Sequence, residues 1–140
     1  MLVFIALASA ADLGYYRQPT LRGDTLVMVA EGDLWRVGTG GGRATRLTTH
    51  PAAESHPQLS PDGTQVAFAA AYEGGDEVWV MPVTGGPPTR LTWTGIGAVP
   101  VGWTSDGQVL VATCATAGLP DTRLLQGDAT DASIVPVPLA

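Results

Sequence analysis

Lysine and asparagine are absent from the 140 residues, and cysteine occurs once. Without lysine the chain has no phosphate-loop lysine, no Schiff-base lysine and no Ser–Lys dyad. Without asparagine it has no acceptor for N-glycosylation. A single cysteine excludes an intrachain disulfide and a zinc site built from several thiolates. These absences remove several classes of enzyme and of metal-binding domain.

Charge is also scarce. Charged residues make up 14% of the chain, all seven cations are arginine, and the net charge is −6. Nucleic-acid binding needs clustered Lys and Arg against the phosphates, so we expect no nucleic-acid partner. The longest apolar run is too short for a transmembrane helix, which needs about 20 residues.

Glycine and proline are plentiful, with 18 and 11 copies, and hydrophobic residues make up 45% of the chain. This composition is typical of short strands separated by many turns. No window of about ten residues after Asp12 shows helical periodicity. The length suits one domain, and we expect an all-β fold.

The N-terminus carries the apolar run Leu2 to Ala8, followed by Ala8-Ser9-Ala10. Residues 1–11 therefore resemble the hydrophobic part and cleavage site of a secretory signal, which predicts a periplasmic or secreted protein. The positive segment that normally precedes such a run is missing. The alternative is a buried first strand with a turn at residues 12–14.

The sequence repeats itself when it is shifted by 44 positions. Over residues 33–48, seven of sixteen residues are identical to their partners in residues 77–92. The matches include Trp35 with Trp79, and the segment Thr-Arg-Leu-Thr at residues 45–48 and 89–92. Three units follow, at about 15–48, 56–92 and 99–138, and the third has diverged most.

Each unit carries four strand signals. In the second unit they are separated by Gly-, Pro- and Asp-rich turns and lie at Pro57–Leu59, Gln65–Ala69, Val78–Met81 and Thr89–Thr92. Four antiparallel strands in a repeat of 40–45 residues predict a blade of a β-propeller. Residues 12–140 are thus expected to form a partial propeller of three four-stranded blades, with Trp35 and Trp79 filling the gaps between blades.

Three blades do not complete a ring, because closed propellers have four to eight. Two blade faces would remain uncovered, and exposed apolar faces mark interfaces or aggregation. We expect either the N-terminal half of a longer chain of six or seven blades, or a half-ring that associates with another copy.

No residue is predicted to be catalytic. The serines are Ser9, Ser55, Ser60, Ser105 and Ser133, and none stands in a Gly-x-Ser-x-Gly motif. The repeat places Ser60 and Ser105 in turns. Cys114 follows a predicted strand at residues 109–113, so an inert buried thiol is favoured over a nucleophile.

His50, Glu54 and His56 offer three donor groups within seven residues, which could hold a metal. Pro51 and Pro57 indicate a loop between blades, so a solvated loop is favoured over a metal site. The glycine-rich run Gly38–Gly42 lacks a following lysine and is expected to be a hairpin turn. No metal or cofactor is therefore predicted.

Three acids also recur at intervals of 44 residues: Asp33, Glu77 and Asp121. They could line the pore of a propeller. Hydrogen bonding to the backbone of a neighbouring blade is an equally good explanation.

The repeat core RLTTHPAAESHPQLSPDGTQVAFAAAYEGGDEVWVMPVTGGPPTRLT resembles the propeller repeats of TolB and of the tricorn proteases. The opening GYYRQPTLRGDTLVMVAEGDLWRV, Gly14 to Val37, is similar to the first blade of a tricorn-type serine protease. Val101 to Thr113 and Gly118 to Leu124 are similar to its third blade. The resemblance covers nearly the whole chain after Asp12.

This resemblance implies a long protein with two propellers, a PDZ-like domain and a serine-protease core. The propellers of this family are not catalytic and control the entry and exit of peptides. The catalytic residues of the family lie beyond Ala140, so none is assigned to this chain. The implied partners are peptides and the remaining blades and domains. The alternatives are a TolB-like envelope interaction module and the propeller of a prolyl-oligopeptidase-like enzyme.

Overall fold

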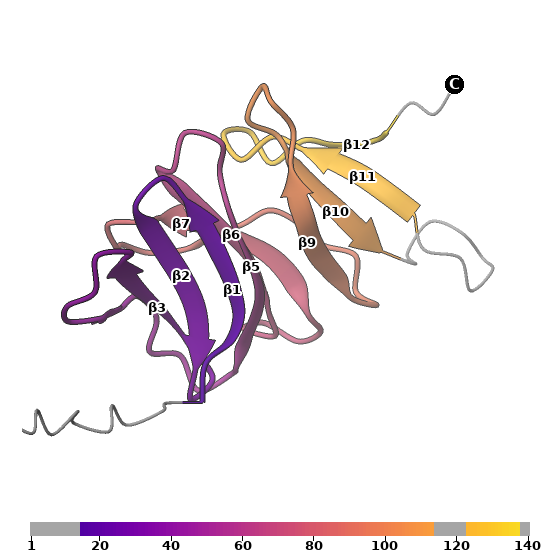
Figure 1. The fold of residues 1–140 in the computed structure, drawn as a ribbon. Coiled ribbons are helices and arrows are strands. Elements are labelled where there is room, and N and C mark those ends of the chain that lie inside the picture. Colours follow the sequence, from indigo (N-terminus) through magenta and orange to yellow (C-terminus); the bar gives the residue numbers. More distant parts are fainter. Residues whose placement is uncertain (1–14, 114–122, 138–140) are drawn as a thin grey trace, which may run out of the picture.

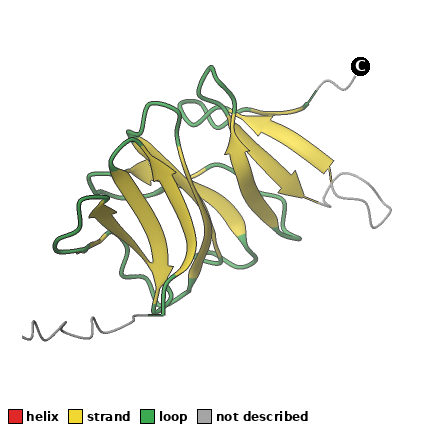
Figure 2. Ribbon diagram, viewed as in Figure 1, coloured by secondary structure: helices red, strands yellow, loops and turns green. Residues whose placement is uncertain are grey.

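The computed structural model describes residues 15–113 and 123–137, and within these ranges it contains twelve strands and no helix (Figure 2). The all-β prediction is confirmed, and the described residues contain no helix that could cross a membrane. The strands form three four-stranded antiparallel sheets, each with neighbouring strands in chain order. We call these sheets blades 1, 2 and 3.

The strand bounds are as follows. Blade 1 consists of β1 (Arg17–Arg22), β2 (Thr25–Ala30), β3 (Asp33–Gly38) and β4 (Thr45–Arg46). Blade 2 consists of β5 (Glu54–Leu59), β6 (Gln65–Ala70), β7 (Glu77–Pro82) and β8 (Thr89–Arg90). Blade 3 consists of β9 (Ala98–Trp103), β10 (Val109–Thr113), β11 (Arg123–Gly127) and β12 (Ile134–Pro136).

The three blades lie side by side, with blade 2 between blades 1 and 3, and they do not form a closed ring (Figure 1). The first strands of adjacent blades lie in contact, β1 with β5 and β5 with β9. This is the arrangement of consecutive blades around a propeller axis.

The turn between β5 and β6 is held by the chemistry that its sequence predicts. Asp62 Oδ1 accepts hydrogen bonds from the Ser60 hydroxyl at 2.6 Å and from the Thr64 amide at 3.0 Å. Gly63 has a φ of 72°, which a glycine adopts without steric cost. Ser60 is therefore a turn residue, as predicted.

Strand β5 begins at Glu54, three residues before the predicted start at Pro57. Glu54 and Ser55 pair with β6, and the register then shifts before Gln58. The bulge contains Pro57, which has no amide hydrogen to donate to the ladder. The predicted strand start at Pro57 is therefore wrong, because this proline interrupts a strand that has already begun.

Two apolar clusters lie between the blades. The first joins blades 1 and 2 and contains Val27, Val29, Leu34, Leu59, Val66, Phe68, Ala70, Trp79, Met81 and Val83. The second joins blades 2 and 3 and contains Ala67, Val78, Val80, Leu91, Ala98, Val109, Val111 and Leu125. Alternate residues of β6 enter different clusters, so both faces of blade 2 are buried. The prediction that Trp79 fills a gap between blades is confirmed.

Candidate functional site

The repeated acid, Arg and second Thr of blade 1 form one polar cluster. Thr48 Oγ1 accepts the Leu34 amide hydrogen at 2.8 Å and lies 3.5 Å from Asp33 Oδ1. The Arg46 guanidinium pairs with the buried Asp33 carboxylate, and its carbon Cζ lies 5.9 Å from the centre of the Trp35 ring. We call this arrangement of acid, Arg and Thr the latch.

Blade 2 repeats the latch. Thr92 Oγ1 accepts the Val78 amide hydrogen at 2.8 Å, and its hydroxyl donates to the buried Glu77 carboxylate. Arg90 lies 3.5 Å from Glu77 and 5.8 Å from the centre of the Trp79 ring. The motif Thr-Arg-Leu-Thr therefore connects the segment after the fourth strand of a blade to the start of its third strand through hydrogen bonds and an ion pair.

A second carboxylate, that of Glu54, contacts the latch of blade 1 through Thr48. Glu54 Oε2 accepts the Thr48 hydroxyl hydrogen at 2.8 Å, and Glu54 Oε1 accepts the Tyr72 hydroxyl hydrogen. Burial raises the pKa of Glu54 despite these two hydrogen bonds, and the nearby Asp33 charge raises it further. Since Glu54 is the first residue of β5, this contact joins blade 1 to blade 2.

The corresponding junction between blades 2 and 3 uses one carboxylate instead of two. Ala98 stands 44 residues after Glu54, and Glu77 is one methylene longer than Asp33. Glu77 Oε1 accepts the Gly95 amide hydrogen at 2.8 Å and the Thr94 hydroxyl hydrogen at 3.2 Å. Burial alone would raise the pKa of Glu77, but the hydrogen bonds from Thr92, Gly95 and Thr94 lower it.

Asp33 and Glu77 are buried within their own blades, so the alternative in which they line a pore does not hold for either. The other alternative, hydrogen bonding to backbone outside their own blade, is seen for Glu77, which accepts the amide hydrogen of Gly95 in the linker to blade 3. Asp121 lies outside the described residues. The residue that pairs with Thr113, as Glu77 pairs with Ala70, is Arg123. The interval of 44 residues therefore does not hold for this position in blade 3, because its hairpin differs in length.

The prediction of a solvated loop at His50, Glu54 and His56 is wrong for Glu54, which is buried in β5. His50 is exposed, and its ring centroid lies 4.1 Å from that of Tyr72. His56 is exposed, as predicted, but it lies in strand β5 and not in a loop. Across residues 15–113 and 123–137, no three His, Cys, Asp or Glu side chains are grouped closely enough to hold a metal ion.

Among the described serines, Ser55 lies beside a histidine. His56 Nδ1 lies 3.0 Å from the hydroxyl of its neighbour Ser55, and no acid contacts this ring among the described residues. Ser105 lies in the turn before β10, as predicted. Ser9 and Cys114 are outside the described residues.

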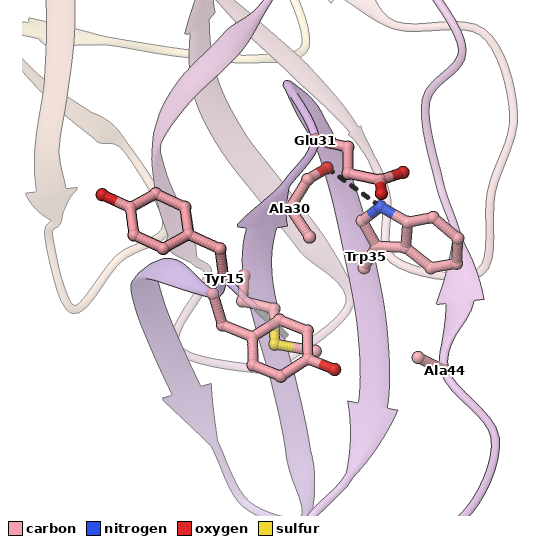
Figure 3. Close-up of a pocket in the computed structure, with 7 residues that line it drawn as sticks. Tyr15, Ala30, Glu31, Trp35 and Ala44 are labelled. Carbon is pink, nitrogen blue, oxygen red and sulfur yellow. Dashed lines mark hydrogen bonds between the residues drawn. The ribbon is translucent and has the colours of Figure 1, made fainter. Parts of the chain in front are cut away.

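A cavity of about 310 Å³ lies on the uncovered face of blade 1. It is lined by Tyr15, Tyr16, Met28, Ala30, Glu31, Trp35 and Ala44. The Trp35 indole nitrogen donates to the Ala30 carbonyl at 3.2 Å across the β2–β3 hairpin (Figure 3). Among the described residues no blade covers this face, so the prediction that Trp35 fills a gap between two blades stays a prediction, whereas Trp79 fills such a gap.

The sequence did not predict a junction formed by Thr48, Glu54 and Tyr72. The repeated second threonine was a usable signal, because a residue that recurs in phase has a structural role in each repeat. Glu54 and Tyr72 had no such signal, since Ala98 stands at the matching position and the loop after β10 differs in length.

The family model for the tricorn protease N-terminal beta propeller domain matches residues 13–139. The chain belongs to this family. Tricorn protease homolog 1 of Streptomyces coelicolor is 41% identical over 107 residues, which are 76% of this chain and 10% of that relative. Putative tricorn protease homolog 2 of the same organism is 39% identical over 124 residues, 85% of this chain and 11% of the relative.

Solved structures agree on the fold. The crystal structure of the tricorn protease superposes with a TM-score of 0.78 at 18% identity, covering 89% of this chain and 13% of the other. TolB from Acinetobacter baumannii superposes with a TM-score of 0.74 at 18% identity, covering 90% of this chain and 33% of the other. The resemblance to tricorn-type and TolB-like propellers is confirmed. The chain spans about a tenth of the length of these two Streptomyces relatives.

Proposed function

We propose that this chain is a non-catalytic propeller segment of a tricorn-type serine protease that scaffolds and gates the access of peptides to a distant active site. The observation that supports the proposal is that the buried polar side chains are engaged in hydrogen bonds and ion pairs within the propeller itself. Asp33, Glu54 and Glu77 all hold strands or blades together. Every buried side-chain nitrogen or oxygen in the described residues has a hydrogen-bond partner. These groups therefore stabilise the scaffold.

The proposed partners are the remaining blades, the protease domains and the peptides that pass through the assembly. The family match and the greater length of the relatives support the first two. Peptides are proposed because the relatives are named as proteases.

A chimera tests this function. Residues 15–137 replace the matching segment of tricorn protease homolog 1, with and without Glu77→Ala, which loosens the junction between blades 2 and 3. If the propeller gates access, the chimera with Glu77→Ala and the chimera without it should hydrolyse a short fluorogenic peptide at the same rate. Their rates on long peptides should differ. Equal effects on both lengths, or peptide hydrolysis by the isolated chain, would contradict the proposal.

We also propose that the protein is exported, on the strength of the signal-like segment 1–11. N-terminal sequencing of the protein expressed in its native host should find a mature chain that begins near Ala11 or Asp12. Recovery of Met1 on soluble cytoplasmic material would contradict export.

A further inference from the structure

Two large apolar side chains are exposed on the linker between blades 2 and 3. Trp93 is 61% exposed and Ile96 is 65% exposed. Single apolar residues on a surface are ordinary, but two large ones within four residues form a small patch. The blades on both sides of this linker are described, and a further blade would pack on the outer face of blade 1 or blade 3. The patch therefore does not depend on further blades.

The backbone of this loop is held in place by the latch of blade 2. Glu77 Oε1 accepts the Gly95 amide hydrogen at 2.8 Å and the Thr94 hydroxyl hydrogen at 3.2 Å. Both donors lie between Trp93 and Ile96 in the chain. The loop is thus ordered before any ligand binds, which lowers the entropic cost of binding.

The Trp93 ring is held as well. The Arg90 guanidinium carbon lies 5.5 Å from the centre of the Trp93 ring and 5.8 Å from that of Trp79. Arg90 is itself fixed, because it donates to the Thr92 carbonyl and to the Glu73 carboxylate, each at 2.7 Å. A cation over the face of an indole ring attracts it, so Trp93 is presented in a defined position.

The linker between blades 1 and 2 does without these two apolar side chains. The interval of 44 residues places Thr49 and Ala52 at the positions of Trp93 and Ile96. The contacts that hold the second loop come from other residues, so joining two blades does not require large apolar side chains here. Exposed aromatic residues that the fold does not require are typical centres of binding surfaces.

Acidic side chains flank the apolar pair. Glu73, which is exposed, contacts the arginine under the Trp93 ring. Asp76 is exposed, and it lines a cavity of about 250 Å³ together with Ile96. The whole chain carries a net charge of −6. A ligand with Lys or Arg beside its apolar residues meets opposite charge at this surface, whereas an acidic ligand is repelled.

We propose that this surface, formed by Trp93, Ile96, Glu73 and Asp76, binds peptides in which apolar residues are flanked by Lys or Arg. The apolar side chains of the peptide pack on Trp93 and Ile96, and its cations pair with the two acids. The choice of peptides as the ligand rests on the proposed function. The surface would give the propeller a preference for basic peptides over acidic ones.

Calorimetric titration of the full 140-residue chain at low ionic strength tests the proposal. The probes are Ac-Gly-Lys-Leu-Lys-Leu-Gly-amide and its counterpart with Glu in place of Lys. We expect the lysine peptide to bind at least about tenfold more tightly, which corresponds to about 1.4 kcal/mol. No binding of the lysine peptide, or equal binding of both, would overturn the proposal.

A first pair of variants locates the apolar contact. Trp93→Ser/Ile96→Ser should weaken binding of the lysine peptide by at least about tenfold. The matched control Tyr16→Ser/Leu21→Ser removes an exposed aromatic and an exposed aliphatic residue of blade 1, and it should bind normally. An equal loss in both variants would mean general adhesion to apolar surface. Far-UV circular dichroism verifies folding, and Ile96→Ser alone serves if the double variant unfolds.

A second pair of variants locates the charge contact. Glu73→Gln/Asp76→Asn should narrow the difference between the two peptides. The control Glu31→Gln/Asp106→Asn removes the same charge from exposed positions elsewhere and should preserve the difference. Equal narrowing in both would mean that net charge alone selects the peptide, and the assignment would fail.

This outcome is separable from that of the proposed function. The chimera experiment compares peptide lengths and leaves Trp93 and Ile96 in place. Loss of the basic preference would therefore overturn the peptide site without changing the length dependence, and loss of the length dependence would overturn the gate without changing the titrations.

Discussion

The hydroxyl of Thr48 lies 2.8 Å from Glu54 Oε2, and this buried hydrogen bond joins the end of blade 1 to the first residue of β5. Thr48 also caps the amide of Leu34 at the start of β3. One side chain therefore fastens its own blade and holds the next blade in place.

Glu54→Gln should raise the melting temperature at neutral pH. The carboxyl has a raised pKa in the folded chain, so the stability that it contributes is fully present below its unfolded pKa, near 4.5, and is lost as the pH rises through the folded pKa. Glutamine is neutral throughout and should abolish this part of the pH dependence. Thermal melts from about pH 4 to about pH 8 measure it. The exposed control Glu31→Gln should keep the profile of the unmodified chain.

Glu77→Ala should have the opposite pH signature. The hydrogen bonds from Thr92, Gly95 and Thr94 lower the pKa of Glu77, so its stabilisation is present above the unfolded value of 4.5 and is lost as the pH falls through the folded pKa. Removing the carboxylate leaves buried donors without an acceptor, which costs about 1–3 kcal/mol at neutral pH. Urea unfolding measures this loss, and a cost that is no smaller in acid would contradict the assignment.

Trp79→Ala and Trp35→Ala compare equivalent positions with and without a covering blade. Trp79 is packed between blades 1 and 2, so its truncation should cost about 3–5 kcal/mol of unfolding free energy. Trp35 lines an open cavity, and its truncation should cost clearly less. Denaturant unfolding is compared at concentrations where sedimentation shows single copies. Equal costs would mean that the blade 1 face is covered within one chain.

Gly127→Ala should weaken the contact between blades 2 and 3. A Cβ atom at this position would lie 3.2 Å from Leu91 Cδ2, and Leu91 is itself buried in the cluster between these blades. We expect a loss of about 1–2 kcal/mol in urea unfolding. In the matched control, Gly102→Ala, the added methyl group meets no atom within 4 Å. That variant should unfold like the original chain.

The sequence by itself determined the blades. The repeat of 44 residues is visible in the sequence alone, and the strand signals and the turn around Asp62 within it are local patterns that follow from the backbone preferences of the residues. The family resemblance also rested on contiguous residues. The blades and the family could therefore be predicted without knowing which blades are in contact.

Only the tertiary structure decided what the repeated residues touch. Trp35 and Trp79 occupy the same position in the repeat of 44 residues. Trp35 lines an open cavity and Trp79 is packed, because among the described residues only Trp79 lies against a neighbouring blade. Glu54 looked like part of a loop, and it is buried because β5 brings it against Thr48 of the preceding blade. Burial and hydrogen bonding between blades depend on residues far apart in the chain, so a local pattern cannot specify them.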